Sequence, residues 1–321
     1  MASIPEYAEL RCVSNFTFLR GASQPEELVE RAKQLGYTAL TIADECSMAG
    51  IVRAHVAAKE HDLKLLVGSQ FLVEWGLAAA ATTTPFVLTV LACNLHGYGN
   101  LCQFITKLRR SSEKGTYQLD ISNISGSELA DCVVLASPKR MSEPEQLATV
   151  ARWLLDNFMG RCWFGVDLLR LLDDEMWLHR LREVSGFSAI PLVAAGDVHF
   201  HVRSRKPLQD VLTATRVGRP LTECGLDLQP NAERHLRTRL RLAQRPTRPP
   251  CWQRRSTWPR AASSISTSCA TSTRMKWCPP ARPRPRTCGA SPTRAQAGAG
   301  PRACRPRSSR KSSTSSNSSA T

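Results

Sequence analysis

The sequence predicts an α/β protein in which strands and helices alternate around a parallel sheet or barrel, followed by a basic tail. Short runs rich in β-branched residues alternate with amphipathic segments as far as about residue 244. All 27 Asp and Glu residues lie at or before Glu233, and the chain up to residue 244 is close to neutral. The remainder has 16 Lys and Arg and no acidic residue. Composition therefore separates a folded domain, 1–244, from a tail, 245–321.

Six segments have the length and composition of buried strands. They are 37–43, 63–73, 86–92, 132–136, 162–166 and 191–195. The stretch 75–106 has no charged residue, but three threonines, a proline, Asn94 and His96 interrupt its apolar character. We therefore predict a loop followed by a buried strand here, and not a membrane span.

Helices are predicted between these strands. Ser23 with Glu26, and Ser142 with Glu145, have the spacing of a capping box at a helix start. In both helices a proline follows in the first turn, where its missing N–H costs nothing. A last helical segment is expected over 231–244.

The tail cannot bury enough apolar surface to fold, because it lacks Leu, Val, Phe and Tyr and has a single Ile. We predict that it is disordered. One interpretation is a nucleic-acid-binding arm, with arginines for phosphates and three tryptophans for stacking. The other, which we favour, is translation of a GC-rich gene in a shifted frame, because the tail combines Arg, Pro, Ala and Ser with five cysteines.

The cellular location is predicted from the cysteines and the N-terminus. The 12 cysteines form no CxxC pair, and the first residues have neither a basic region nor an apolar core for secretion. We therefore expect a cytoplasmic protein without a membrane anchor.

Four segments place polar residues where a predicted strand ends. They read LRCVSNFTFLRGAS, ALTIADECSMAG, LLVGSQFLV and PLVAAGDVHF. These segments occur in the same order as in one known family, and the resemblance extends over residues 7–244. The longer matches IADECSMAG and AAGDVHFHVRSR contribute to it. The family is the N-terminal polymerase-and-histidinol-phosphatase (PHP) domain of bacterial C-family DNA polymerases, in the error-prone branch that acts in damage-induced mutagenesis.

The resemblance implies which residues would hold metal ions. In the family these segments supply His and carboxylate ligands to a cluster of divalent ions. Asp44, Asp197 and His199 match the family's ligand positions and are the candidate metal ligands here. The other four positions hold different residues, namely Arg11, Val13, Glu45 and Gln70.

The substitutions predict a weak metal site at best. Arg11 brings a permanent positive charge to the place of a cation, and Val13 offers no lone pair. Asp44, Asp197 and His199 can still hold one divalent ion loosely. The alternative is that both aspartates are structural, capping helices or pairing with Arg11 at the barrel mouth.

The resemblance also implies the fold and the function. The fold is expected to be a distorted (β/α)7 barrel. The chain is interpreted as an N-terminal fragment of an error-prone DNA polymerase, whose Mg²⁺-binding catalytic carboxylates lie beyond residue 244 and whose partners are DNA and other components of the mutagenic polymerase assembly. The fragment itself is expected neither to polymerise DNA nor to hydrolyse phosphate esters. The alternatives are an independent metal-dependent phosphoesterase and a basic-tailed nucleic-acid-binding protein.

Overall fold

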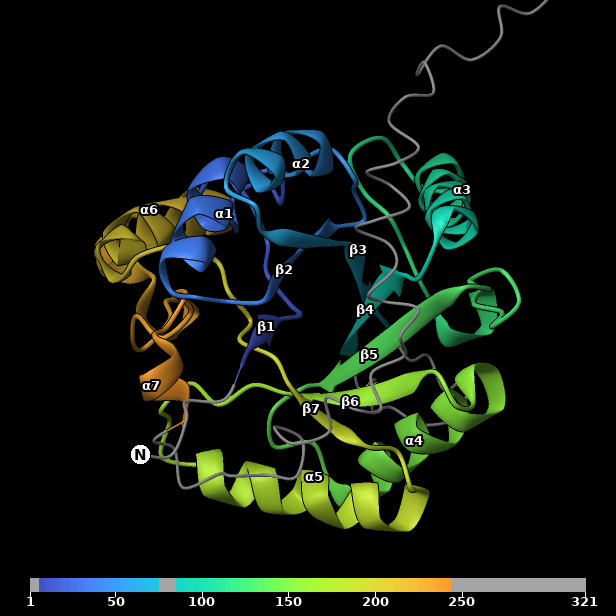
Figure 1. Ribbon diagram of the computed structural model, residues 1–321. Coiled ribbons are helices and arrows are strands. Elements are labelled where there is room, and N and C mark those ends of the chain that lie inside the picture. Colours follow the sequence, from blue (N-terminus) through green and yellow to red (C-terminus); the bar gives the residue numbers. More distant parts are fainter. Residues whose placement is uncertain (1–5, 75–84, 244–321) are drawn as a thin grey trace, which may run out of the picture. The chain divides into compact units, whose positions relative to one another are not determined.

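Seven strands in sequence order form one sheet in the computed structural model, which describes residues 6–74 and 85–243 (Figure 1). The strands are β1 (Ala8–Glu9), β2 (Ala39–Glu45), β3 (Lys64–Val73), β4 (Phe86–Ala92), β5 (Cys132–Pro138), β6 (Cys162–Val166) and β7 (Leu192–Ala194). All neighbours are parallel except that β4 runs antiparallel to both β3 and β5.

The sheet curls into a nearly closed barrel. A parallel bridge joins Cys12, just after β1, to Val198, just after β7. Two backbone hydrogen bonds support this bridge, from Val13 N to Val198 O (2.9 Å) and from Val198 N to Arg11 O (3.0 Å). The expected distorted α/β barrel is confirmed, with one reversed strand as its distortion.

Helices surround the barrel (Figure 1). They are α1 (Pro25–Gln34), α2 (Ile51–Glu60), α3 (Leu95–Ser111), α4 (Pro144–Phe158), α5 (Asp174–Ser188), α6 (Lys206–Val217) and α7 (Arg239–Ala243). Side chains on successive residues of β5 point to opposite faces of the sheet. Val134 and Ala136 pack in the cluster with α3, α4 and α5, whereas Val133 and Leu135 join a cluster that contains no helical residue. The second cluster fills the barrel below its carboxyl end.

The predicted helix starts are wrong by one residue. The N-caps are Gln24 and Glu143, and the reciprocal side chains come from Glu27 and Gln146. Ser23 does not cap α1, because its hydroxyl lies 2.7 Å from His201 Nδ1 and accepts from the His201 backbone N–H. The prolines do occupy the first turn of both helices.

The predicted helix over 231–244 is largely wrong, because within the described chain only Arg239–Ala243 is helical there. The preceding residues lie along the barrel. Asn231 donates to Leu169 O at 2.7 Å, and His235 forms a parallel bridge with Phe200. Tertiary hydrogen bonds thus replace helical ones in this segment.

The described residues contain no helix that could span a membrane. They all belong to one compact unit. The predicted boundary at residue 244 and the tail, 245–321, lie outside the described residues.

Candidate functional site

A cavity of about 320 Å³ opens at the end of the barrel where β1, β2, β3, β5, β6 and β7 finish and β4 begins. Parallel barrels place their functional residues at this end, because each strand there delivers a side chain to a common centre. The wall is polar and strongly charged. Its charged members are Arg11, Arg20, Glu45, Lys139, Arg140, Asp167, Asp197, Arg216 and Arg234.

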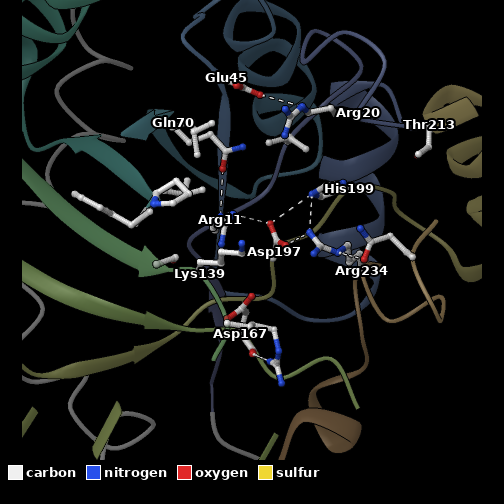
Figure 2. Close-up of a pocket in the computed structure, with 18 of the residues that line it drawn as sticks. Arg11, Arg20, Glu45, Gln70, Lys139, Asp167, Asp197, His199, Thr213 and Arg234 are labelled. Carbon is white, nitrogen blue, oxygen red and sulfur yellow. Dashed lines mark hydrogen bonds and ion pairs between the residues drawn. The ribbon is translucent and has the colours of Figure 1, made fainter. Parts of the chain in front are cut away.

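Asp197 lies between two guanidinium groups (Figure 2). Its Oδ1 is 3.1 Å from Arg11 Nη2, and its Oδ2 accepts a hydrogen bond from Arg234. Asp197 is 2% exposed, so its carboxylate is largely shielded from bulk solvent. Its backbone adopts φ 47°, in the left-handed region that Asp tolerates better than most residues. The pairing with Arg11 that the alternative interpretation proposed is confirmed.

His199 lies beside this pair. Its Nε2 accepts a hydrogen bond from Arg234 Nη1 at 3.1 Å, because a guanidinium can only donate. The ring proton is therefore on Nδ1, which has no hydrogen-bond partner within the described part of the chain. Burial lowers the pKa of His199 to about 3, and the nearby Arg11 adds to the shift. The ring is neutral at pH 7.

Asp44 does not line the cavity. Its Oδ1 accepts from Ser14 N (2.8 Å) and from the Thr17 hydroxyl (2.7 Å), and its Oδ2 accepts from the Ser14 hydroxyl (2.8 Å). Burial raises the pKa of Asp44, and the hydrogen bonds from Thr17 and Ser14 oppose that shift. Asp44 therefore holds the turn that follows β1.

The packing around Asp44 explains two glycines. A Cβ on Gly21 would lie 1.9 Å from Ser14 O, and a Cβ on Gly50 would lie 2.6 Å from Asp44 Oδ2. Gly21 is thus required by a close approach of the Ser14 backbone, and Gly50 by a close approach of the Asp44 carboxylate. These positions fix the shape of the turn without contributing a side chain to the cavity.

The positions that differ from the expected ligand pattern are engaged in other contacts. Gln70 Oε1 accepts from Arg11 Nε at 3.2 Å. Glu45 pairs with Arg20 at 3.3 Å and accepts from the Tyr117 hydroxyl at 2.9 Å. Arg11 is 7% exposed, and burial lowers its pKa. The cavity centre is therefore built around a buried guanidinium.

Residues 9–154 match the family described as PHP domain. The barrel is a PHP domain. Its relatives include error-prone DNA polymerases from Dechloromonas aromatica, 49% identical over 246 residues, and from Bordetella parapertussis, 48% identical over 250 residues. The matches cover 75% of this chain and 23% of each relative, so the chain spans less than a quarter of the length of these proteins. The error-prone DNA polymerase from Pseudomonas aeruginosa is 45% identical over 232 residues, which are 72% of this chain and 21% of that protein.

The residues of this PHP domain do not fit the metal cluster that its family implies. No group of three or more His, Cys, Asp or Glu side chains within 6–74 and 85–243 is arranged to hold a metal ion. Asp197 and His199 lie together, but Arg234 donates to both. Lone pairs that would face a cation face guanidinium hydrogens instead.

Several residues at the mouth of the PHP barrel were not singled out by the sequence motifs. Arg234 lies 37 residues beyond Asp197, in the segment predicted to be helical. Burial, followed by repulsion from Arg11, lowers the pKa of Arg234 to about 10, so it stays charged at pH 7. Lys139 and Asp167 follow β5 and β6 directly, and their position after a strand was the available signal.

Proposed function

We propose that this PHP domain is a non-hydrolytic platform within an error-prone DNA polymerase that carries out mutagenic synthesis in the bacterial cytoplasm. Identity of 45–49% to error-prone DNA polymerases supports the family role. The observation that carries the non-hydrolytic part is the engagement of Asp197 by Arg11 and Arg234. A guanidinium at the place of a cation supplies charge but cannot activate a water as a metal ion does.

Metal content tests this proposal. The full chain is incubated with Mn²⁺ or Zn²⁺, dialysed and assayed for bound metal and for hydrolysis of p-nitrophenyl phosphate. We expect less than one ion per chain and no turnover. A matched variant restores the family's ligand types with Arg11→His, Val13→His and Gln70→Glu, and it is expected to bind metal more tightly than the unaltered chain.

The independent phosphoesterase is the second candidate. Its one favourable observation is that Asp197 and His199 lie side by side in the cavity. Two or three tightly bound ions, with hydrolysis lost on Asp197→Ala, would contradict the platform role and favour the phosphoesterase. Such a result would also show that the guanidinium groups move aside.

DNA synthesis is a separate part of the proposal. The polymerase activity, its DNA substrate and its protein partners belong to relatives of which the chain spans less than a quarter. We therefore expect no primer extension by the 321-residue chain with Mg²⁺ and all four deoxynucleotides. Extension would contradict the platform role.

The nucleic-acid-binding alternative concerns residues 245–321, which lie outside the described residues. Salt-sensitive binding of DNA that disappears when this tail is deleted would favour it.

A further inference from the structure

The cavity at the barrel mouth has an excess of positive charge. Six of its lining side chains are cationic, namely Arg11, Arg20, Lys139, Arg140, Arg216 and Arg234, and three are anionic, namely Glu45, Asp167 and Asp197. The net charge of the wall is therefore +3. A charged concave surface with a low-dielectric floor focuses its field on whatever enters.

Part of this positive charge is not neutralised by the protein. Lys139 and Arg216 form no ion pair and no side-chain hydrogen bond within 6–74 and 85–243. Arg20 is half exposed and contacts Glu45 through Nε at 3.3 Å. Donors thus remain for a ligand after the internal pairs are made.

The wall also contains a buried amide whose oxygen is unpaired. Gln209 is 4% exposed and lines the cavity, and its Oε1 has no hydrogen-bond partner among the described residues. The amide can present either its oxygen or its nitrogen to a ligand, because a half-turn exchanges the two. A buried polar side chain with an unpaired atom indicates a contact that is completed by something else.

We propose that the barrel mouth is a metal-free binding site for a phosphate group, in which guanidinium and ammonium groups take the place of the family's metal ions. Arginine suits this task, since its planar fork matches phosphate oxygens and stays charged. The volume of about 320 Å³ lies at the lower end of small-ligand pockets, which span about 300–1,000 Å³. It therefore has room for a phosphate that carries one further group. The shared chemistry is a phosphate dianion, from free phosphate or from a nucleotide.

Calorimetric titration of the full chain tests the site. The probes are inorganic phosphate, deoxyadenosine 5′-monophosphate and unphosphorylated deoxyadenosine, all with EDTA present. We expect saturable binding of the first two and none of deoxyadenosine. If inorganic phosphate and deoxyadenosine 5′-monophosphate bind with equal affinity, the phosphate group alone is the ligand. If the nucleotide binds more tightly, the site recognises a nucleotide. Binding that EDTA abolishes, or equal binding of deoxyadenosine, overturns the proposal.

Matched variants separate the cavity from other basic parts of the chain. The double variant Lys139→Ala with Arg216→Ala is expected to weaken phosphate binding about tenfold or more, because it removes two charged donors. The control combines Lys59→Ala with Arg182→Ala, two exposed basic residues that do not line the cavity, and is expected to change affinity less than about twofold. Equal losses in the two double variants would contradict the proposal.

A gain of affinity excludes misfolding as the explanation. Asp167 lines the cavity, is 8% exposed and interacts electrostatically with Arg11 and Arg234. Asp167→Asn keeps the shape and removes a negative charge, so phosphate binding should tighten about fivefold. Unchanged or weaker binding would refute the site. The phosphate titration is done with EDTA and the metal assay with added metal ions. Failure of the phosphate site can therefore be told apart from failure of the platform role.

Discussion

Replacing Asp44 by alanine removes the hydrogen-bond acceptor that organises the turn after β1. Three donors point at this carboxylate at 2.7–2.8 Å, from Ser14 N, the Ser14 hydroxyl and the Thr17 hydroxyl. Each hydrogen bond to a charged group contributes about 1.5–3 kcal/mol. Burial raises the pKa of Asp44, which offsets part of this contribution. We therefore expect the free energy of unfolding to fall by about 3–5 kcal/mol.

Thermal unfolding followed by circular dichroism measures this loss. For a domain of this size the midpoint should drop by about 10 °C. Asp44→Asn is the matched control, because its remaining oxygen still accepts from Ser14 N and Thr17, and it should cost about 1 kcal/mol. The reasoning is refuted if Asp44→Ala unfolds at the same temperature as the unaltered chain.

Three other substitutions probe the barrel. Gly196→Ala places a Cβ 2.2 Å from Glu9 Oε2, so unfolding in urea should require about 1–3 kcal/mol less, and an unchanged midpoint would contradict the packing. Burial raises the pKa of Glu9, so the folded state favours its protonated form. The stability that this adds is present below the ordinary pKa of a glutamate and is lost as the pH rises through the raised pKa of the folded state. Glu9→Gln should therefore gain stability relative to the unaltered chain as pH is raised from 4 to 8, whereas a constant difference would oppose this reasoning. Arg161 donates to three backbone carbonyls, two in the loop before β5 and one on the first residue of β5, so Arg161→Ala should lose about 3 kcal/mol in urea unfolding. Arg152→Ala, on an exposed face of α4, serves as its control.

Strand positions were predictable because their apolar runs are continuous. The ranges of β4 and β6 coincide with the predicted 86–92 and 162–166. The direction of β4 was not predictable, because side-chain composition is the same in either direction. β1 was missed, since two residues carry no periodicity. The cap of α1 was misplaced by one residue because a tertiary contact to His201 occupies Ser23, and that of α4 because the Ser142 hydroxyl donates to Lys139 O.

The candidate site was only partly predictable. The motifs placed Asp197 and His199 together and suggested the contact between Asp197 and Arg11, which the structure shows. Asp44 belongs to the same motif set, yet it lies outside the cavity wall. Arg234 could not be foreseen, because its segment was predicted to be helical and its contact with Asp197 depends on the closed barrel.

The bridge between Cys12 and Val198 constrains when the barrel can close. Its partners are separated by nearly the whole described chain, whereas neighbouring strands from β2 to β6 are connected over much shorter distances. Joining distant segments costs more chain entropy, so the sequential strand pairs assemble before this seam. During synthesis the ribosome must release residue 198, and Arg234 after it, before the charged centre can assemble. A nascent chain stalled earlier would have most of the sheet but none of the paired guanidinium groups around Asp197.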